Sequence, residues 1–344
     1  RDRDWGAPAA VKFNSMGELH AVNQGNGEVV RIDIETGERT VLAVFPEGWL
    51  DNLAFDSQDR LFVSSASEGA IVEILDNGST REVSPGGMIV PMGISLVENV
   101  LYTAEPTTLR SFDSSTGEQL GVRRSTFGLG PFSLPTNVSE IAGNLVLMSF
   151  ISNQFLVWDL KADSPIVETS FLLPMDAEPF QGDLLISEIG AGRVVRARMP
   201  DLVHREVIAE GLFFPAGIAV YEDDAYVSDA VQGTVFQIIR GGDVLSEPEP
   251  VATDLNVPEG LSLNIDGSKL LVIEGDISSL TEIDLETGAR VTIASDLNFQ
   301  PRKAIPGLIT HWFNDVAVDK NGVMYVNSDG NSIIYKFKSD AQPR

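Results

Sequence analysis

Short apolar strands separated by polar turns recur along the whole chain. In the clearest copy, Val316, Val318, Met324 and Val326 occupy alternate positions on either side of Asp319-Lys320-Asn321-Gly322. A period of two residues predicts half-buried strands, and an Asn-Gly pair, which tolerates positive φ angles, predicts a tight hairpin turn. Helical periodicity of useful length appears nowhere in the chain. The pattern therefore predicts an all-β protein.

The strand pattern repeats with a period of about 40 residues, which is typical of propeller blades. The first strand of each repeat begins near one of the following residues: Ala9, Asp51, Met92, Thr136, Met175, Ala216, Glu259 and Asn314. Each repeat holds four short strands, except the last, which ends after three. We therefore predict a single β-propeller domain over residues 1–344, with about eight repeat units. Six or seven blades with irregular segments are the alternative.

One interval is longer than the others, because 55 residues separate Glu259 from Asn314. The extra residues, 297–312, precede the innermost strand of the last repeat, so we predict a lid-like insertion over the mouth of the central channel. Long ordered loops often carry function. In this insertion Arg302, Lys303 and Trp312 are candidates for contacting a substrate. His311 is a candidate general acid or base, since histidine titrates near neutral pH.

The composition narrows the classes of partner. Twenty-four Lys and Arg against 50 Asp and Glu give a net charge of −26, which repels nucleic acid and anionic membranes but attracts divalent cations. A solubilising surface is the other interpretation of this charge. No apolar run approaches the roughly 18 residues of a membrane span. The chain has no cysteine, so disulfides and thiolate metal sites are excluded. An acidic, cysteine-free chain that starts at Arg1 leads us to expect a processed, periplasmic or secreted protein.

Polar side chains cluster in the predicted channel at the entries of the innermost strands. Most entries carry a small residue, but five positions carry an oxygen-bearing side chain: Asn52, Asn137, Glu259, Asn314 and Asp315. Carboxylate and amide oxygens that converge are ligands for a hard cation, calcium above all, with magnesium, manganese and zinc as alternatives. The other interpretation is that each Asn or Asp caps a turn through the nearby backbone.

A second polar set marks the ends of the second strands, which return to the same face. Its members could coordinate a cation, act as a base, hold the lid, or simply be solvated strand ends: Asn23, Ser64, Glu105, Glu188, Asp229, Glu274 and Asn327. Motifs of other chemistries are missing from the sequence. It contains no phosphate-binding glycine loop, no Gly-x-Ser-x-Gly elbow and no His-Glu-x-x-His.

Phe313-Asn314-Asp315 and the strand that follows resemble the Asn-Asp corner of the gluconolactonase/senescence-marker-protein family, to which paraoxonases are related. Pro258-Glu259-Gly260 and Pro215-Ala216-Gly217 resemble its Pro-x-Gly strand entries. The resemblance implies a propeller that binds a divalent metal in its channel and hydrolyses lactones or related esters. Asn314 matches the family's corner Asn, and Glu259 and Asn137 lie where the family places ligands. The chain departs from the six-bladed family in its eight repeats and in Ala9-Ala10, where the family has Glu.

These observations predict a metal-dependent hydrolase of a small-molecule lactone or ester. Glu259, Asn314 and Asn137 would hold the cation, and Asp315 or His311 would activate water. Asn52, Arg302, Lys303 and Trp312 would contact the substrate. Two alternatives stay open. One is a metal-free lyase or isomerase with Glu259 or His311 as general base, and the other is a binding scaffold without enzymatic activity.

Overall fold

The computed structural model describes residues 8–45, 50–65, 69–84, 86–124, 132–299 and 314–338. These residues form 31 strands in eight antiparallel sheets, and their helices are two short 3-10 turns, η1 (Ile189–Ala191) and η2 (Gly275–Ile277). The predicted all-β class and the eight repeat units are therefore confirmed. The chain divides into two compact units, residues 1–89 and 90–344, which are described separately. One domain over residues 1–344 stays a prediction.

The first unit consists of two four-stranded sheets that share one apolar core. Its strands are β1 (Pro8–Phe13), β2 (Leu19–Asn23), β3 (Glu28–Ile32), β4 (Arg39–Val44), β5 (Leu50–Phe55), β6 (Leu61–Ser65), β7 (Ala70–Ile74) and β8 (Thr80–Ser84). Val22 and Val29 of the first sheet pack with Leu53 and Val63 of the second. The alternating strands thus bury one face of each sheet against the other.

The second unit consists of six sheets, numbered here in chain order, each with its strands in sequence order. Its strands are β9 (Met92–Val97), β10 (Val100–Glu105), β11 (Thr108–Asp113), β12 (Gln119–Arg124), β13 (Asn137–Ile141), β14 (Asn144–Met148), β15 (Gln154–Asp159), β16 (Ser164–Ser170), β17 (Pro174–Phe180), β18 (Asp183–Glu188), β19 (Arg193–Ala197), β20 (Arg205–Glu210), β21 (Pro215–Tyr221), β22 (Asp224–Asp229), β23 (Thr234–Arg240), β24 (Asp243–Ala252), β25 (Pro258–Leu263), β26 (Lys269–Glu274), β27 (Ser279–Asp284), β28 (Arg290–Ala294), β29 (Val316–Val318), β30 (Val323–Ser328) and β31 (Ile333–Lys338).

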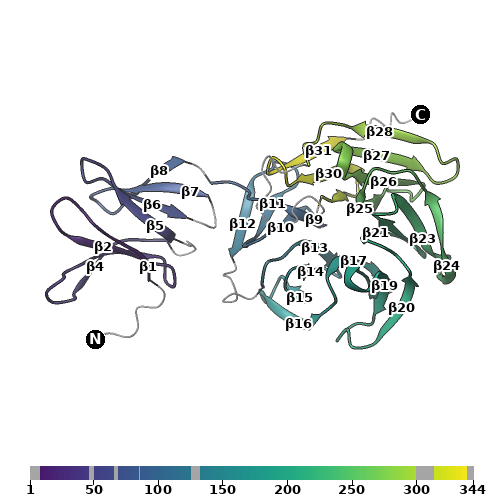
Figure 1. The fold of residues 1–344 in the computed structure, drawn as a ribbon, viewed down its shortest axis with the longest axis horizontal. Coiled ribbons are helices and arrows are strands. Elements are labelled where there is room, and N and C mark those ends of the chain that lie inside the picture. Colours follow the sequence, from purple (N-terminus) through teal and green to yellow (C-terminus); the bar gives the residue numbers. More distant parts are fainter. Residues whose placement is uncertain are drawn as a thin grey trace. The chain divides into compact units, whose positions relative to one another are not determined.

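These six sheets close into a ring (Figure 1). The innermost strands β9, β13, β17, β21, β25 and β29 contact one another in that order, and β29 contacts β9. An apolar cluster fills each of the six spaces between neighbouring sheets. At the closure Tyr325 packs with Ile94 and Leu101, and the Asn327 side chain donates a hydrogen bond to the Pro91 carbonyl at 2.8 Å. The six-bladed alternative thus describes this unit.

The middle strands of the ring depart from strict alternation. Leu145, Val146 and Leu147 of β14 are all at most 2% exposed, and β18 and β26 show the same continuous burial. Each of these strands is covered by a neighbouring sheet on both faces, so both side-chain rows must be apolar. The outermost strands, such as β16 and β28, stay largely exposed. This burial fixes the ring and holds its inner strands in place.

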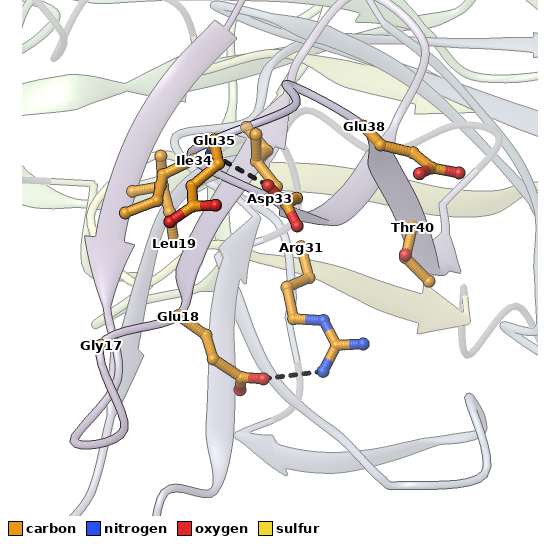
Figure 2. Close-up of a pocket in the computed structure, with 10 residues that line it drawn as sticks. Gly17, Glu18, Leu19, Arg31, Asp33, Ile34, Glu35, Glu38 and Thr40 are labelled. Atoms are coloured by element: carbon orange, nitrogen blue, oxygen red, sulfur yellow. Dashed lines mark hydrogen bonds and ion pairs between the residues drawn. The ribbon is translucent and has the colours of Figure 1, made fainter.

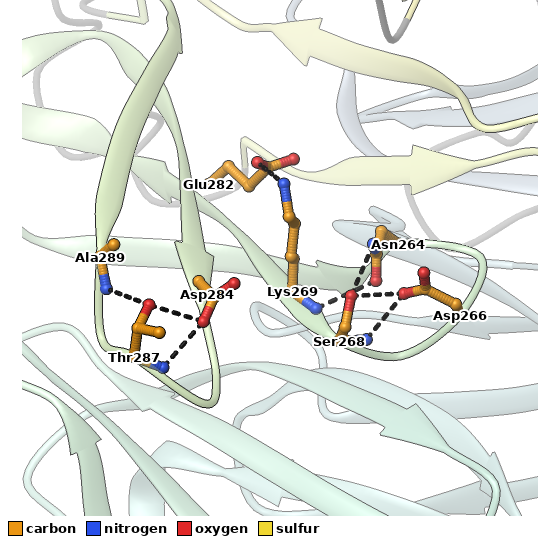
Figure 3. Close-up of polar contacts among 8 residues, drawn as sticks. All are labelled: Asn264, Asp266, Ser268, Lys269, Glu282, Asp284, Thr287 and Ala289. Carbon is orange, nitrogen blue, oxygen red and sulfur yellow. Dashed lines mark hydrogen bonds and ion pairs between the residues drawn. The ribbon is translucent and has the colours of Figure 1, made fainter. Parts of the chain in front are cut away.

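The predicted turns are present, and short side chains hold them. In the β27–β28 turn Asp284 Oδ1 accepts hydrogen bonds from the N–H and hydroxyl of Thr287, and Gly288 has a φ of +70° (Figure 3). In the turn before β30, Asp319 Oδ1 accepts the N–H groups of Asn321 and Val323. Only Gly322 of the Asn-Gly pair takes a positive φ there, +77°, because Asp319 caps the turn from its first position.

Three residues of the predicted insertion 297–312 are described. Leu297 and Phe299 are 3% and 1% exposed, and both pack in the core between the last two sheets. The remaining residues of the insertion lie outside the described part of the chain. No helix among the described residues is long and apolar enough to cross a membrane.

Candidate functional site

The entries of the inner strands meet at one end of the ring, which we call the mouth. Side chains and backbone of four neighbouring strands and the Asn314 corner enclose a cavity of about 20 Å³: Asn137, Met175, Asp176, Ala216, Gly217, Glu259, Gly260, Asn314 and Asp315. That space fits about one water molecule or a bare ion. A second cavity, of about 200 Å³, is lined by residues of all six inner strands, so it follows the axis of the ring. Four of the five oxygen-bearing residues predicted at the strand entries therefore lie together around the small cavity.

Asn137 uses both ends of its amide within the ring wall. Its Oδ1 accepts the Val138 N–H at 2.7 Å, and its Nδ2 donates to the Met175 carbonyl at 2.8 Å and to Asp176 Oδ1 at 3.1 Å. Opposite it stands Gly93, where a Cβ would lie 2.0 Å from Asn137 Oδ1. The amide thus joins the second sheet to the third, and we leave Asn137 out of the ligand set proposed below.

Asp176 and Asp315 serve the wall in the same way. Asp176 accepts the N–H groups of Ala177 and Ile218 at 2.8 and 2.7 Å, the second across to the next sheet. Asp315 Oδ1 accepts the Val316 N–H at 2.8 Å. Burial raises the pKa of Asp176 to about 6, and burial together with the charge of Asp176 raises the pKa of Asp315. Asp176 was not among the five predicted oxygen donors, although it stands one residue after an entry, as Asn137 and Asp315 do.

Glu259 and Asn314 form the centre of the mouth and are each 1% exposed. Glu259 Oε2 accepts two hydrogen bonds from Asn314, from the backbone N–H at 3.1 Å and from Nδ2 at 2.9 Å. Glu259 Oε1 is buried and has no hydrogen-bond partner among the described residues. Gly275 makes room for this oxygen, because a Cβ there would lie 2.0 Å from it. The predicted pair is therefore assembled, with one carboxylate oxygen left over.

Asp329 adds a second buried carboxyl that the sequence analysis missed. It directly follows β30, and its N–H donates to Asn314 Oδ1 at 3.2 Å. The side chain is 4% exposed, and although the Asn314 side chain and the Gly330 N–H lie close enough to lower its pKa, neither carboxylate oxygen accepts a hydrogen bond of normal geometry from the described residues. In four other sheets of the ring the corresponding residue is small or apolar: Pro106, Ile189, Ala230 and Gly275. A carboxylate at this break in the repeat was the available signal.

The two carboxyls share an unfavourable environment. Burial raises the pKa of Glu259 well above its usual value, against the hydrogen bonds from Asn314, and the charge of Asp329 raises it further. Burial also raises the pKa of Asp329 to about 8. Buried carboxylates normally bind a cation, pair with a base or stay protonated. Three carboxylate oxygens without partners therefore fit a hard cation, although no three His, Asp or Glu side chains of the described residues form a metal-binding group.

Apolar side chains form the other part of the mouth. Met92, Met175, Phe214, Ala216 and Ala230 pack into one buried cluster, and four partly buried residues join it: Val90, Phe150, Ile189 and Val257. Met175 and Ala216 also line the small cavity with Glu259. The mouth thus pairs a polar corner with an apolar wall, as ligand sites commonly do.

Five members of the second polar set lie in the ring, and all five are buried and bonded to neighbouring groups rather than facing solvent. Glu188 accepts the Leu172 N–H and pairs with Arg193, and Asp229 accepts the N–H groups of Phe213 and Phe214. In the same manner Glu274 accepts the Asn256 N–H, and Asn327 Oδ1 accepts the Asp315 N–H. Glu105 forms a buried ion pair with Arg110. These residues fix the backbone around the mouth.

The other predicted site residues do not enter this description. His311, Trp312, Arg302 and Lys303 lie outside the described residues, so their roles stay predictions. Asn52 belongs to the first unit, where it is exposed and its Oδ1 accepts the Leu53 N–H at 2.9 Å. The mouth of the second unit is therefore built without it.

The first unit carries a larger cavity of about 550 Å³ on the β1–β4 sheet (Figure 2). Its lining is charged and includes Glu18, Arg31 and Asp33. Arg31 pairs with Glu18 at 2.9 Å, and Asp33 Oδ1 accepts the N–H groups of Glu35 and Thr36. Arg31 and Glu18 thus pair with each other, and Asp33 is held by backbone N–H groups. No predicted site residue lines this cavity. We therefore take the mouth of the ring as the candidate site.

Comparison with known proteins supports the fold. No protein-family model matches the sequence, and no curated protein matches it. Among solved structures, the calcium-binding protein regucalcin from Agrobacterium tumefaciens is similar with a TM-score of 0.51 and 14% identity over 70% of this chain and 82% of its own. Virginiamycin B lyase from Staphylococcus aureus is similar with a TM-score of 0.44 and 13% identity over 78% of this chain and 92% of its own. At these identities the likeness to regucalcin shows the fold alone: the chain is a β-propeller protein.

Proposed function

We propose that the six-sheet ring hydrolyses a lactone or related ester at its mouth, with a divalent cation, calcium in the first place, held by Glu259 and Asp329. The observation that carries the proposal is the pair of buried carboxyls with three oxygens that have no partner among the described residues. Leaving such groups unpaired costs stability, so a site that keeps them has a use for them. Similarity to a calcium-binding propeller adds support.

The described residues position the carboxyls for this task. Two hydrogen bonds from Asn314 fix Glu259 Oε2, so Oε1 has one orientation, and the Asp329 backbone is tied to the same Asn314 side chain. A bound cation would polarise the ester carbonyl and stabilise the oxyanion that forms on it. Burial of both carboxyls keeps bulk water away and strengthens every charge interaction at the site. Asn314 is therefore a positioning residue in this proposal.

Water activation requires a base near the carbonyl. Asp315 is the described candidate, since it lines the small cavity with Glu259 and its pKa is raised by burial and by Asp176; to act as a base it has to release one of the N–H groups of Val316 and Ile94 that it accepts in the wall. His311 is the other candidate and stays a prediction. Hydrolysis adds one water across the acyl C–O bond, with its hydroxyl passing to the carbonyl carbon and a proton to the leaving oxygen.

A second candidate function has its own observation. With a pKa of about 8, Asp329 is largely protonated at neutral pH when no cation is bound, and the pKa of Glu259 is raised as well. A neutral carboxyl beside a second one is suited to acid–base chemistry without metal, as in a lyase or isomerase. The two candidates differ in their response to chelation.

The test is a chelation and add-back experiment with the full chain. Hydrolysis of lactones and esters is followed with and without EDTA, and then with calcium, magnesium, manganese or zinc restored. The hydrolase proposal expects turnover to be lost on chelation and to recover with one ion. Asp329→Asn should have no turnover in either condition. Turnover that survives EDTA would favour acid–base chemistry without metal. Absence of both ester turnover and ion binding would overturn the hydrolase proposal, and the metal-free candidate would then be tested by the fall in stability that ionisation of Asp329 should cause above about pH 8.

A further inference from the structure

The mouth of the ring also displays an exposed apolar surface, which we call the apolar rim. It consists of five large apolar side chains: Ile151, Leu172, Phe213, Val231 and Ile277, which are 45%, 49%, 69%, 67% and 50% exposed. They lie in loops of four consecutive sheets, at the end where the inner strands begin. Scattered exposed apolar residues are ordinary, but several large ones in the loops at the end of the ring that holds the candidate site favour a binding surface there.

Buried carboxylates hold the backbone of the rim in place. The Leu172 N–H donates to Glu188 Oε1 at 2.7 Å. Asp229 accepts the N–H of Phe213 at 2.7 Å and that of Val231 at 3.1 Å, one on each oxygen. Glu188 and Asp229 are at most 1% exposed. A rim fixed in this way is pre-organised, so a ligand that covers it loses little entropy in ordering the loops.

The rim is continuous with the candidate site. Phe213 and Val231 adjoin Phe214 and Ala230, which belong to the buried apolar cluster of the mouth. That cluster includes Met175 and Ala216, which line the small cavity with Glu259. Packed apolar side chains therefore connect the exposed loops with the residues that line the small cavity.

We propose that the apolar rim binds the alkyl or aryl chain of a neutral ester or lactone whose carbonyl lies at Glu259 and Asp329. This inference rests on the proposed function, because it assigns the substrate class of the same site. It selects substrates with an apolar chain over polar ones such as sugar lactones, since the five rim side chains offer apolar contact area and no hydrogen bond, even though exposed Ser152, Gln232 and Asp276 flank three of them. An anionic substrate is disfavoured because the chain carries a net charge of −26, and the apolar rim favours a neutral substrate over a cationic one.

The experiment uses two matched series of probes on the calcium-supplemented full chain. Hydrolysis of p-nitrophenyl esters from acetate to decanoate measures kcat/KM against chain length. Binding of methyl ketones of the same lengths, which carry a carbonyl but no ester bond, is measured by calorimetry. Each buried methylene should raise kcat/KM or affinity by up to about fourfold, until the rim is covered.

Phe213→Ser and Val231→Ser should each lower the affinity for the longest probe by about tenfold and leave that for the shortest unchanged. Val203→Ser is the matched control, because Val203 is 70% exposed in the β19–β20 loop at the opposite end of its sheet. Equal binding across the ketone series, or equal loss in the control, would overturn the inference. Chain-length-dependent ketone binding without ester hydrolysis would uphold the rim as a binding surface and overturn the proposed hydrolase.

Discussion

Asp329→Asn should change the stability of the protein in opposite directions with and without a cation. In the chelated protein two buried carboxyls, Glu259 and Asp329, lie near one another with three oxygens lacking partners. A neutral amide at position 329 removes one of the two buried acids. The amide also spares folding a proton uptake, because burial raises the pKa of Asp329 to about 8 and the same carboxyl is ionised at pH 7 in the unfolded chain; this relief outweighs the polar groups of the amide by about 1–3 kcal/mol. We therefore expect the variant to gain roughly 1–3 kcal/mol in EDTA.

The cation reverses the order of the two proteins. At a free calcium concentration of about 1,000 times Kd, the wild type gains about 4.1 kcal/mol, and the variant, lacking a charged ligand, gains little. A unit of this size shifts its Tm by about 2–4 °C per kcal/mol. The wild type should therefore rise by roughly 8–16 °C with calcium, whereas Asp329→Asn should start higher in EDTA and stay there.

Differential scanning calorimetry at pH 7, with EDTA and then with each divalent ion in excess, measures both effects. Glu259→Gln should behave as Asp329→Asn does, and Glu286→Gln is the control, since Glu286 is an exposed carboxylate in the β27–β28 turn. A variant that keeps the full calcium shift would refute the assignment of Asp329 as a ligand. A wild type that no ion stabilises would refute the cation site.

Three further results follow from the same structure. Gly275→Ala should cost about 1–3 kcal/mol in chemical denaturation and abolish the calcium shift, because its Cβ would displace Glu259 Oε1; an unchanged calcium titration would contradict this. Glu178→Gln should raise Tm at pH 8 but not at pH 4. Burial and the charges of Asp176 and Asp315 raise the pKa of Glu178, so the stability that its protonated form contributes is lost as pH rises through the folded-state pKa. An equal effect at both pH values would count against this reasoning. Arg110→Met should destabilise the protein by about 3–5 kcal/mol, because it removes the cation of a buried ion pair with Glu105. Arg31→Met should cost less than about 1 kcal/mol, because its ion pair with Glu18 is partly exposed. Similar losses in the two variants would show that burial does not set these energies.

The period of the apolar pattern predicted the sheets but not how they group. Intervals near 40 residues recur with equal regularity in both units, because each one reports a single four-stranded sheet. Ring closure depends instead on whether the last sheet packs against a particular earlier one. The Tyr325 contacts with Ile94 and Leu101 decide this, and they join residues more than 200 positions apart. Local periodicity carries no record of such a pairing.

The sequence predicted where the residues of the candidate site meet, and their roles in metal binding and catalysis stay predictions. Asn137 and Asp315 stand at the entries as expected, and each caps the N–H of the following residue, which was the alternative interpretation. Asn137 is also bound to Met175, about 40 residues away, and the sequence gives no sign of this contact. Glu259 and Asn314 met as predicted. Asp329 was missed because a carboxylate after a strand looks like a solvated turn residue until its burial is known.

The repeat also explains where chemistry can arise in this ring. Where an entry carries an Asn or Asp, as at Asn137 and Asp176, the side chain bonds the next residue and the neighbouring sheet, so these oxygens are consumed in holding the wall. The Glu259 side chain is one methylene longer than that of Asp and stands one residue earlier in the entry. Its Oε2 therefore accepts the hydrogen bond from Asn314 Nδ2, and its Oε1 has no partner among the described residues. Asp329 replaces a small or apolar residue at a position where the repeat needs no hydrogen bond. Both departures fall on the last two sheets, whereas the apolar cluster around Met175 and Phe214 belongs mainly to other sheets, so the mouth has a polar side and an apolar side.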